Sequence, residues 1–277
     1  MFNRLNIKMT DKYSQLKQTL FGFLSGAINV IIFNPFDRAL NIATKNHTTI
    51  FISSYWNLNS IYQGVHHGFI QRTISYGLWY PIVNIIDINM HNLNMKNNFV
   101  DNKIISSVMA SGFIGFITSP ISSAKQQYWN SDQKIGILKF SKQMYKIGGH
   151  YAFMRGTLVT IKRDMLFGSI FGYLSFSHNK EKKFIFDAMY ATIATTLSSP
   201  FNYIRVMKYK TECNVKTSSV VIFTDLIKSV KKECNKNILY QIIYTFHNKF
   251  NVGWGSIRVG CGMALSRQLF EYFNQFN

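Results

Sequence analysis

The stretch QTLFGFLSGAINVIIFNPF, residues 18–36, contains no Asp, Glu, Lys or Arg. Residues 104–124 and residues 188–204 share this property. A helix needs roughly 20 residues of predominantly apolar character to cross the hydrocarbon core of a bilayer. Length and charge distribution therefore predict a membrane-spanning helix at each of these three places.

Three shorter uncharged stretches each follow closely after an arginine, namely Arg72, Arg163 or Arg258, and they cover residues 73–86, 165–179 and 259–266. An arginine at the centre of a bilayer costs about 2.5 to 3.5 kcal/mol on insertion scales. We therefore expect the three side chains to face a water-filled interior. The alternative is an arginine near the membrane surface that reaches the lipid phosphates. The chain is predicted to contain six apolar segments that alternate in type.

The overall composition limits the class of protein. The 277 residues include 31 Lys and Arg against 12 Asp and Glu, a formal charge of +19, and 47% are hydrophobic, which is too apolar for a disordered basic chain. The charge and the 16% of aromatic residues raise the possibility of nucleic-acid binding. However, the basic residues are spread over several loops, and the uncharged runs are long enough to span a membrane. We therefore expect no nucleic-acid partner.

Catalytic and metal-binding patterns are missing from the sequence. Cys213, Cys234 and Cys261 are too widely spaced for a zinc motif or a disulfide framework. We find no phosphate-binding loop, no nucleophile with its base and no paired-carboxylate motif. The sequence thus predicts a protein that is not an enzyme and that needs no metal or cofactor.

Three of the four prolines indicate an internal repeat. Pro35, Pro120 and Pro200 lie at or near the C-terminal ends of the long uncharged runs and are separated by 85 and 80 residues. A recurrence of this period is the signature of tandem structural units. We expect three repeats, residues 18–100, 101–182 and 183–277, in which the prolines kink the first helix of each.

The residues around these positions are similar to the motifs of the mitochondrial carrier family. The prolines open the stretches PFDRAL, PISSAKQQ and PFNYIR, and two of the arginines precede an aromatic-glycine pair, Tyr76-Gly77 and Phe167-Gly168. The family has a proline motif with an acid and a base in its first helix and an aromatic-x-glycine element before its second, which Tyr62-Gln-Gly64 and Met154-Arg-Gly156 resemble. The likeness extends over residues 18–275 in three copies, so the chain resembles a divergent member.

The resemblance implies an all-α membrane protein with six transmembrane helices in three tandem pseudo-threefold repeats. Residues 1–277 would form a single carrier domain with short helices on the matrix side, the second of them near residues 135–149. It also implies a monomer in the mitochondrial inner membrane, with both termini towards the intermembrane space and cardiolipin as a possible lipid partner. The implied function is transport of a small anionic metabolite by alternating access.

The resemblance further implies a gate on the matrix side, built from an acid and a base in each proline motif. The residues at its positions are Asp37, Ser122, Lys125, Gln127, Asn202 and Arg205. Asp37 and Lys125 would form the only complete ion pair, and Gln127 would brace it. Ser122 offers Arg205 a hydroxyl, whereas Asn202 would meet Leu40. Because the gate is incomplete, an alternative is a carrier-like membrane adaptor that has lost transport.

The substrate site is predicted at Arg72, Arg163, Asp164 and Arg258, with Gln71 as an alternative contact to Arg72. Arginine binds carboxylate or phosphate through two parallel hydrogen bonds, so the substrate is expected to be anionic. The pair Arg163-Asp164 resembles that of amino-acid carriers, in which the acid would receive a substrate amine. The two side chains could equally neutralise each other. An amino acid, a carboxylate and a nucleotide all remain open.

Overall fold

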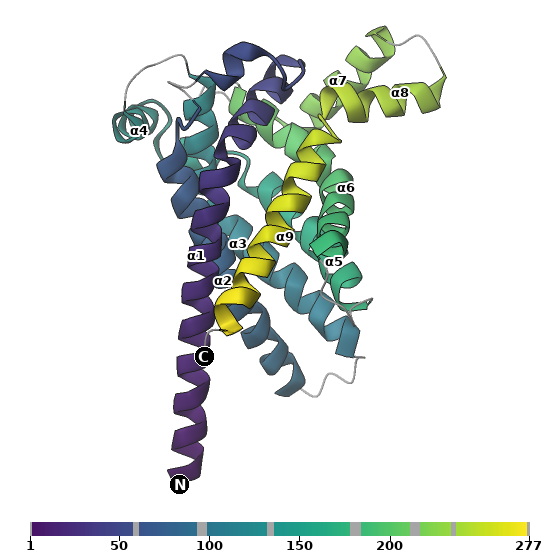
Figure 1. The fold of residues 1–277 in the computed structure, drawn as a ribbon. Helices are drawn as coiled ribbons and strands as arrows, with labels where there is room; N and C mark the ends of the chain where they lie inside the picture. Colours follow the sequence, from purple (N-terminus) through teal and green to yellow (C-terminus); the bar gives the residue numbers. More distant parts are fainter. Residues whose placement is uncertain are drawn as a thin grey trace.

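The computed structural model describes residues 2–57, 61–92, 99–131, 136–177, 184–210, 217–233 and 237–275, and within these ranges it contains helices and no strand. The long helices are α1 (Phe2–Asn46), α2 (Val65–Asn92), α3 (Phe99–Asn130), α5 (Thr157–Ser177), α6 (Phe184–Lys210) and α9 (Trp254–Gln275). Each of them contacts the next one along the chain, and α9 packs against α1. The long helices therefore form a closed ring (Figure 1).

Shorter helical elements lie at the end of the ring that is remote from the N-terminus (Figure 1). They are the 3₁₀ turn η1 (Ser53–Trp56), α4 (Ile137–Met154), α7 (Ser219–Glu233), α8 (Ile238–Tyr244) and the π-helical turn η2 (Thr245–Lys249). The helix expected near residues 135–149 corresponds to α4. Its Phe140 and Met144 pack on Ala124 and Tyr128 of α3, so α4 covers one wall of the ring at this end.

The three prolines lie inside their helices rather than at the helix ends. Pro35, Pro120 and Pro200 are within α1, α3 and α6, and each helix continues for ten or eleven residues beyond its proline. A proline cannot donate the backbone hydrogen bond of its position and normally disturbs an isolated helix. Each of the three helices nevertheless continues through its proline.

A glycine with positive φ immediately precedes the second helix of each pair. Gly64 lies before α2, Gly156 before α5 and Gly253 before α9, with φ values of 74°, 79° and 113°. This region of backbone conformation is accessible to glycine at little cost. The first two glycines stand out in the sequence within Tyr62-Gln-Gly and Met154-Arg-Gly. The third glycine lacks such a motif, because Asn251 stands two positions before it, where the other copies have Tyr62 and Met154.

Neighbouring helices approach one another closely where small residues face backbone atoms. A Cβ at Gly26 of α1 would lie 2.8 Å from the Arg72 carbonyl oxygen of α2. A Cβ at Gly260 of α9 would lie 2.5 Å from the Ala188 carbonyl oxygen of α6. Such contacts are typical of helices that associate in a membrane, where close backbone packing takes the place of a hydrophobic driving force.

Two helical segments in the described part of the chain are long and apolar enough to cross a membrane, Thr19–Asn46 with a mean hydropathy of 1.5 and Ile104–Asn130 with 1.6. Their most apolar windows are only 39% and 44% buried, whereas the core helix of a soluble protein is mostly buried. The uncharged run of residues 188–204 lies in α6, which does not reach this hydropathy. The threonines and serines of this run lower its mean value.

Polar and apolar side chains are distributed in an unusual way around the ring. On α3, the large apolar side chains Met109, Phe113 and Phe116 are exposed, whereas Ser107 and Ser119 are completely buried. The same contrast holds on α1 and α6, which expose leucine, isoleucine and phenylalanine and bury serine and arginine. The interior of the ring is therefore more polar than its outer surface.

Candidate functional site

A cavity of about 290 Å³ lies inside the ring and is lined by side chains from all six long helices. The predicted substrate-site residues Gln71, Arg72, Arg163, Asp164 and Arg258 all line it. Both candidates for the first contact, Gln71 and Arg72, are among them, so the choice between the two stays open. The structure thus brings together residues that are up to 187 positions apart in the chain.

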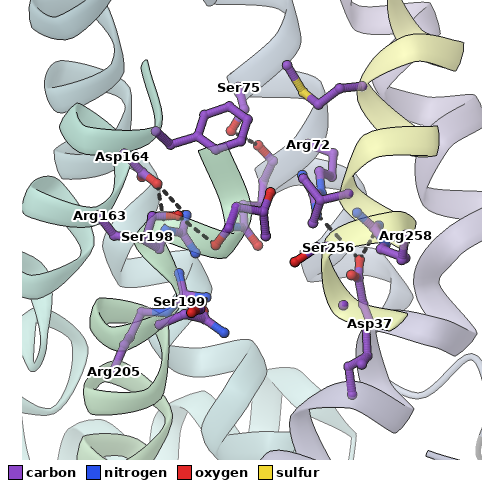
Figure 2. A pocket seen from close by; sticks show the side chains of 18 of the residues that line it. Asp37, Arg72, Ser75, Arg163, Asp164, Ser198, Ser199, Arg205, Ser256 and Arg258 are labelled. Carbon is purple, nitrogen blue, oxygen red and sulfur yellow. Dashed lines mark hydrogen bonds and ion pairs between the residues drawn. The ribbon is translucent and has the colours of Figure 1, made fainter. Parts of the chain in front are cut away.

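Asp37 is held by two of these arginines. Its Oδ2 accepts a hydrogen bond of 2.6 Å from Nη2 of Arg258 and lies 3.5 Å from Nη2 of Arg72 (Figure 2). The Arg258 side chain is only 4% exposed, and its guanidinium also lies 4.9 Å from the centre of the Phe33 ring. One carboxylate of α1 therefore compensates arginines of α2 and α9.

The ion pair predicted between Asp37 and Lys125 is not formed. The arginines of α2 and α9 lie nearer to the carboxylate, and Nζ of Lys125 instead lies 4.9 Å above the centre of the Trp129 ring. The indole of Trp129 is fixed by a hydrogen bond of 2.6 Å from its Nε1 to the carbonyl oxygen of Gln63. The repeat motif pairs Asp37 with the base of the next repeat, but its carboxylate instead contacts Arg72 of its own repeat and Arg258 of the third.

Arg163 and Asp164 pair with each other on α5. Nε of Arg163 donates a hydrogen bond of 2.8 Å to Oδ1 of Asp164, and Nη2 of Arg163 contacts the same oxygen. Gly115 of α3 provides the space for the carboxylate, since a Cβ at this position would lie 2.7 Å from Oδ2. The geometry corresponds to the second of the two predicted alternatives, the mutually neutralised pair.

The remaining residues of the predicted gate do not form one network. Nη2 of Arg205 donates a hydrogen bond of 2.7 Å to Oδ1 of Asn202 on the same helix, α6. Ser122 is buried, and its hydroxyl has no hydrogen-bond partner in the described structure. Gln127 donates hydrogen bonds to Ser123 and to the carbonyl oxygen of Ala152, so it ties α3 to α4 rather than bracing Asp37.

Another ion pair, which was not predicted from the sequence, joins α6 to α9. Arg267 of α9 contacts Oδ1 of Asp187 on α6, and Asp187 is buried. An available signal was the single acidic residue at the start of α6, directly before an uncharged run. The side chains of Phe270 and Glu271, near the end of α9, lie outside the described part of the structure.

Comparisons with known proteins leave the family open. A scan of the chain against protein-family models finds no match, and a search of curated proteins finds no relative. The cavity and the sequence motifs are therefore the basis on which a function can be proposed.

Proposed function

We propose that the chain is a transmembrane solute carrier that moves a small anionic metabolite by alternating access. The observation that carries the proposal is the charged cavity enclosed by six helices, with Arg72, Arg163 and Arg258 at its wall. Charged side chains that line an interior cavity of a membrane protein are expensive to maintain and usually mark a path for a solute or an ion. The exposed apolar side chains of the outer surface fit a lipid environment.

The fold supports this proposal as three tandem helix pairs. Within each pair, a proline lies ten or eleven residues before the end of the first helix, and a glycine with positive φ lies directly before the second. Transporters are commonly built from internal repeats that surround a site in the middle of the membrane. The resemblance to the mitochondrial carrier family favours six membrane spans and a location in the mitochondrial inner membrane.

Uptake into liposomes tests the proposal directly. The full-length chain, reconstituted into liposomes, should take up at least one radiolabelled compound from a panel of dicarboxylates, nucleotides and amino acids. Arg163→Gln should lower this uptake by about tenfold or more, whereas Lys139→Gln, at an exposed position on α4, should leave it unchanged. Uptake of no anion by folded, membrane-inserted protein, or equal uptake by both variants, would contradict the proposal.

A second candidate function is that of a membrane adaptor that has lost transport. It is favoured by the internal compensation of the cavity, where Asp37 and Asp164 already occupy the three arginines that a substrate anion would need. An adaptor would show no uptake in the same assay. It would also tolerate Arg163→Gln in a growth complementation experiment, since its function would reside on the outer surface.

A further inference from the structure

Two buried cations of the cavity, Lys125 on α3 and Arg205 on α6, have no carboxylate partner in the described structure. Their residues are only 5% and 7% exposed, and both line the cavity. Lys125 has the Trp129 ring as its neighbour, and Arg205 has the neutral amide oxygen of Asn202. Nε of Arg205 makes no hydrogen bond. In this respect they differ from Arg72, Arg163 and Arg258, each of which contacts a carboxylate, Asp164 for Arg163 and the shared Asp37 for the other two.

The lack of compensation follows from the sequence of the proline motifs. The residue two positions after each proline is Asp37, Ser122 or Asn202, so only the first motif supplies an acid. A buried charge without a counter-ion is destabilising by several kcal/mol. In the described part of the chain, no carboxylate lies within ion-pair distance of either of these two interior cations.

Lys125 and Arg205 line the same cavity, so both contribute a positive field to its interior. Six cationic side chains line the cavity, together with the carboxylates of Asp37 and Asp164. A third carboxylate, Asp187, pairs with Arg267, one of the six. Three positive charges are therefore left without a matching negative charge. Neutral groups with unused hydrogen-bonding capacity lie nearby, including the buried Oε1 of Gln126. A cavity that is lined by charges of one sign and has low-dielectric walls concentrates ions of the opposite charge.

We propose that Lys125 and Arg205 bind one anionic group, a phosphate or a carboxylate, of the solute that enters the cavity. The solute then carries at least two negative charges, because a single charge would leave most of the excess uncompensated. A zwitterionic amino acid fits poorly, since Asp164 is already engaged by Arg163 and offers no free carboxylate to an amine. This inference deepens the proposed function and depends on it only for the step of transport.

Thermal unfolding of the detergent-purified, full-length chain tests the site without any transport assay. Inorganic phosphate and succinate, titrated at constant ionic strength, should raise the Tm of the wild-type protein in a saturable manner, because a ligand that binds only the folded state stabilises it. Glutamine, a zwitterion, should not raise it. No Tm shift with phosphate, or an equal shift with glutamine, overturns the proposal.

The variants Lys125→Gln and Arg205→Gln locate the site. Each should weaken the apparent affinity for phosphate by about tenfold or more, since each removes a charged hydrogen-bond donor. Lys139→Gln on α4 is the matched control, which should bind phosphate like the wild type. Equal affinity in the wild type and both cavity variants overturns the assignment.

The Tm in the absence of phosphate separates binding from a structural role. Both cavity variants should unfold at the same temperature as the wild type or higher, because the substitution removes an uncompensated buried charge. A clear decrease in Tm would show that the protein itself already compensates these cations, and would overturn the proposal. Phosphate binding with no uptake of any solute would contradict the transport function and leave the anion site established.

Discussion

Asp37→Asn is the most informative single perturbation, because one carboxylate holds two arginines from different helices. The substitution keeps the size of the side chain and removes its charge. Arg258 would then be almost fully buried without a counter-ion, since its side chain is only 4% exposed. Removing one partner of a buried ion pair typically costs about 3 to 5 kcal/mol.

The expected loss lies at the lower end of that range. The side chains of Asp37 and Arg72 are 20% and 25% exposed to the cavity, so water screens part of their interaction. We therefore expect a loss of about 3 kcal/mol. For a chain of this size, a loss of 1 kcal/mol lowers Tm by about 2 °C. The Tm of Asp37→Asn should thus decrease by about 6 °C, measured by intrinsic fluorescence of the protein in detergent.

A double-mutant cycle identifies the partner of Asp37. Combined with Arg258→Gln, Asp37→Asn should show a coupling free energy of about 1 to 3 kcal/mol, as expected for residues in direct contact. Combined with Lys125→Gln, the coupling free energy should be smaller, because these two side chains form no ion-pair contact. The reasoning is refuted if the coupling to Lys125 is the larger of the two, which would restore the ion pair that the sequence motif predicts.

Two further predictions concern other charged pairs. Arg163→Gln should lower the initial rate of uptake by about tenfold or more, because it removes a bidentate charged contact. Asp164→Asn, in contrast, should preserve or increase the uptake of a dianion. A loss of dianion uptake in Asp164→Asn would show that the carboxylate of Asp164 contacts the substrate. Glu233 of α7 accepts a hydrogen bond of 2.8 Å from Lys249, and this bond holds the pKa of the Glu233 carboxyl below its ordinary value of 4.5. A lowered pKa stabilises the folded state above the ordinary value, and this contribution is lost as the pH falls through the pKa of the folded state. Glu233→Gln should therefore lower the Tm at neutral pH, and in acid the Tm of the variant should approach that of the wild type. A difference in Tm that persists in acid would show that the charge of Glu233 is not the cause of the stabilisation.

The long helices could be predicted because their signals are local. Runs without charge and the regular spacing of Pro35, Pro120 and Pro200 are properties of the linear sequence, and the structure has a helix through each. Helix ends were less predictable. The apolar run begins at residue 18, but α1 begins at Phe2, because a polar segment can continue a helix outside an apolar environment.

The cavity residues were predictable for a related reason, whereas their partners were not. An arginine directly before an apolar stretch has few stable positions other than an interior cavity or the membrane surface. Which carboxylate it meets depends on side-chain reach and helix rotation, which sequence spacing does not determine. Asp37 meets Arg258, 221 residues away, and Asp187 meets Arg267, 80 residues away. The first contact joins α1 to α9, where the ring closes, and the second joins α6 to α9, which follow each other among the long helices.

The pair of Asp37 and Arg258 lies where the first long helix meets the last, which connects binding to motion in the proposed carrier. A ligand shifts a conformational equilibrium only if it binds the two states with different free energies. An anion that takes Arg258 from Asp37 replaces an intramolecular contact between α1 and α9 by a contact to the solute. Binding would thereby weaken the joint between these helices, and an empty cavity would keep it closed. In the proposed carrier, the internal carboxylate would thus link the presence of a solute to the opening of the ring, provided that the solute carries enough negative charge to compete with it.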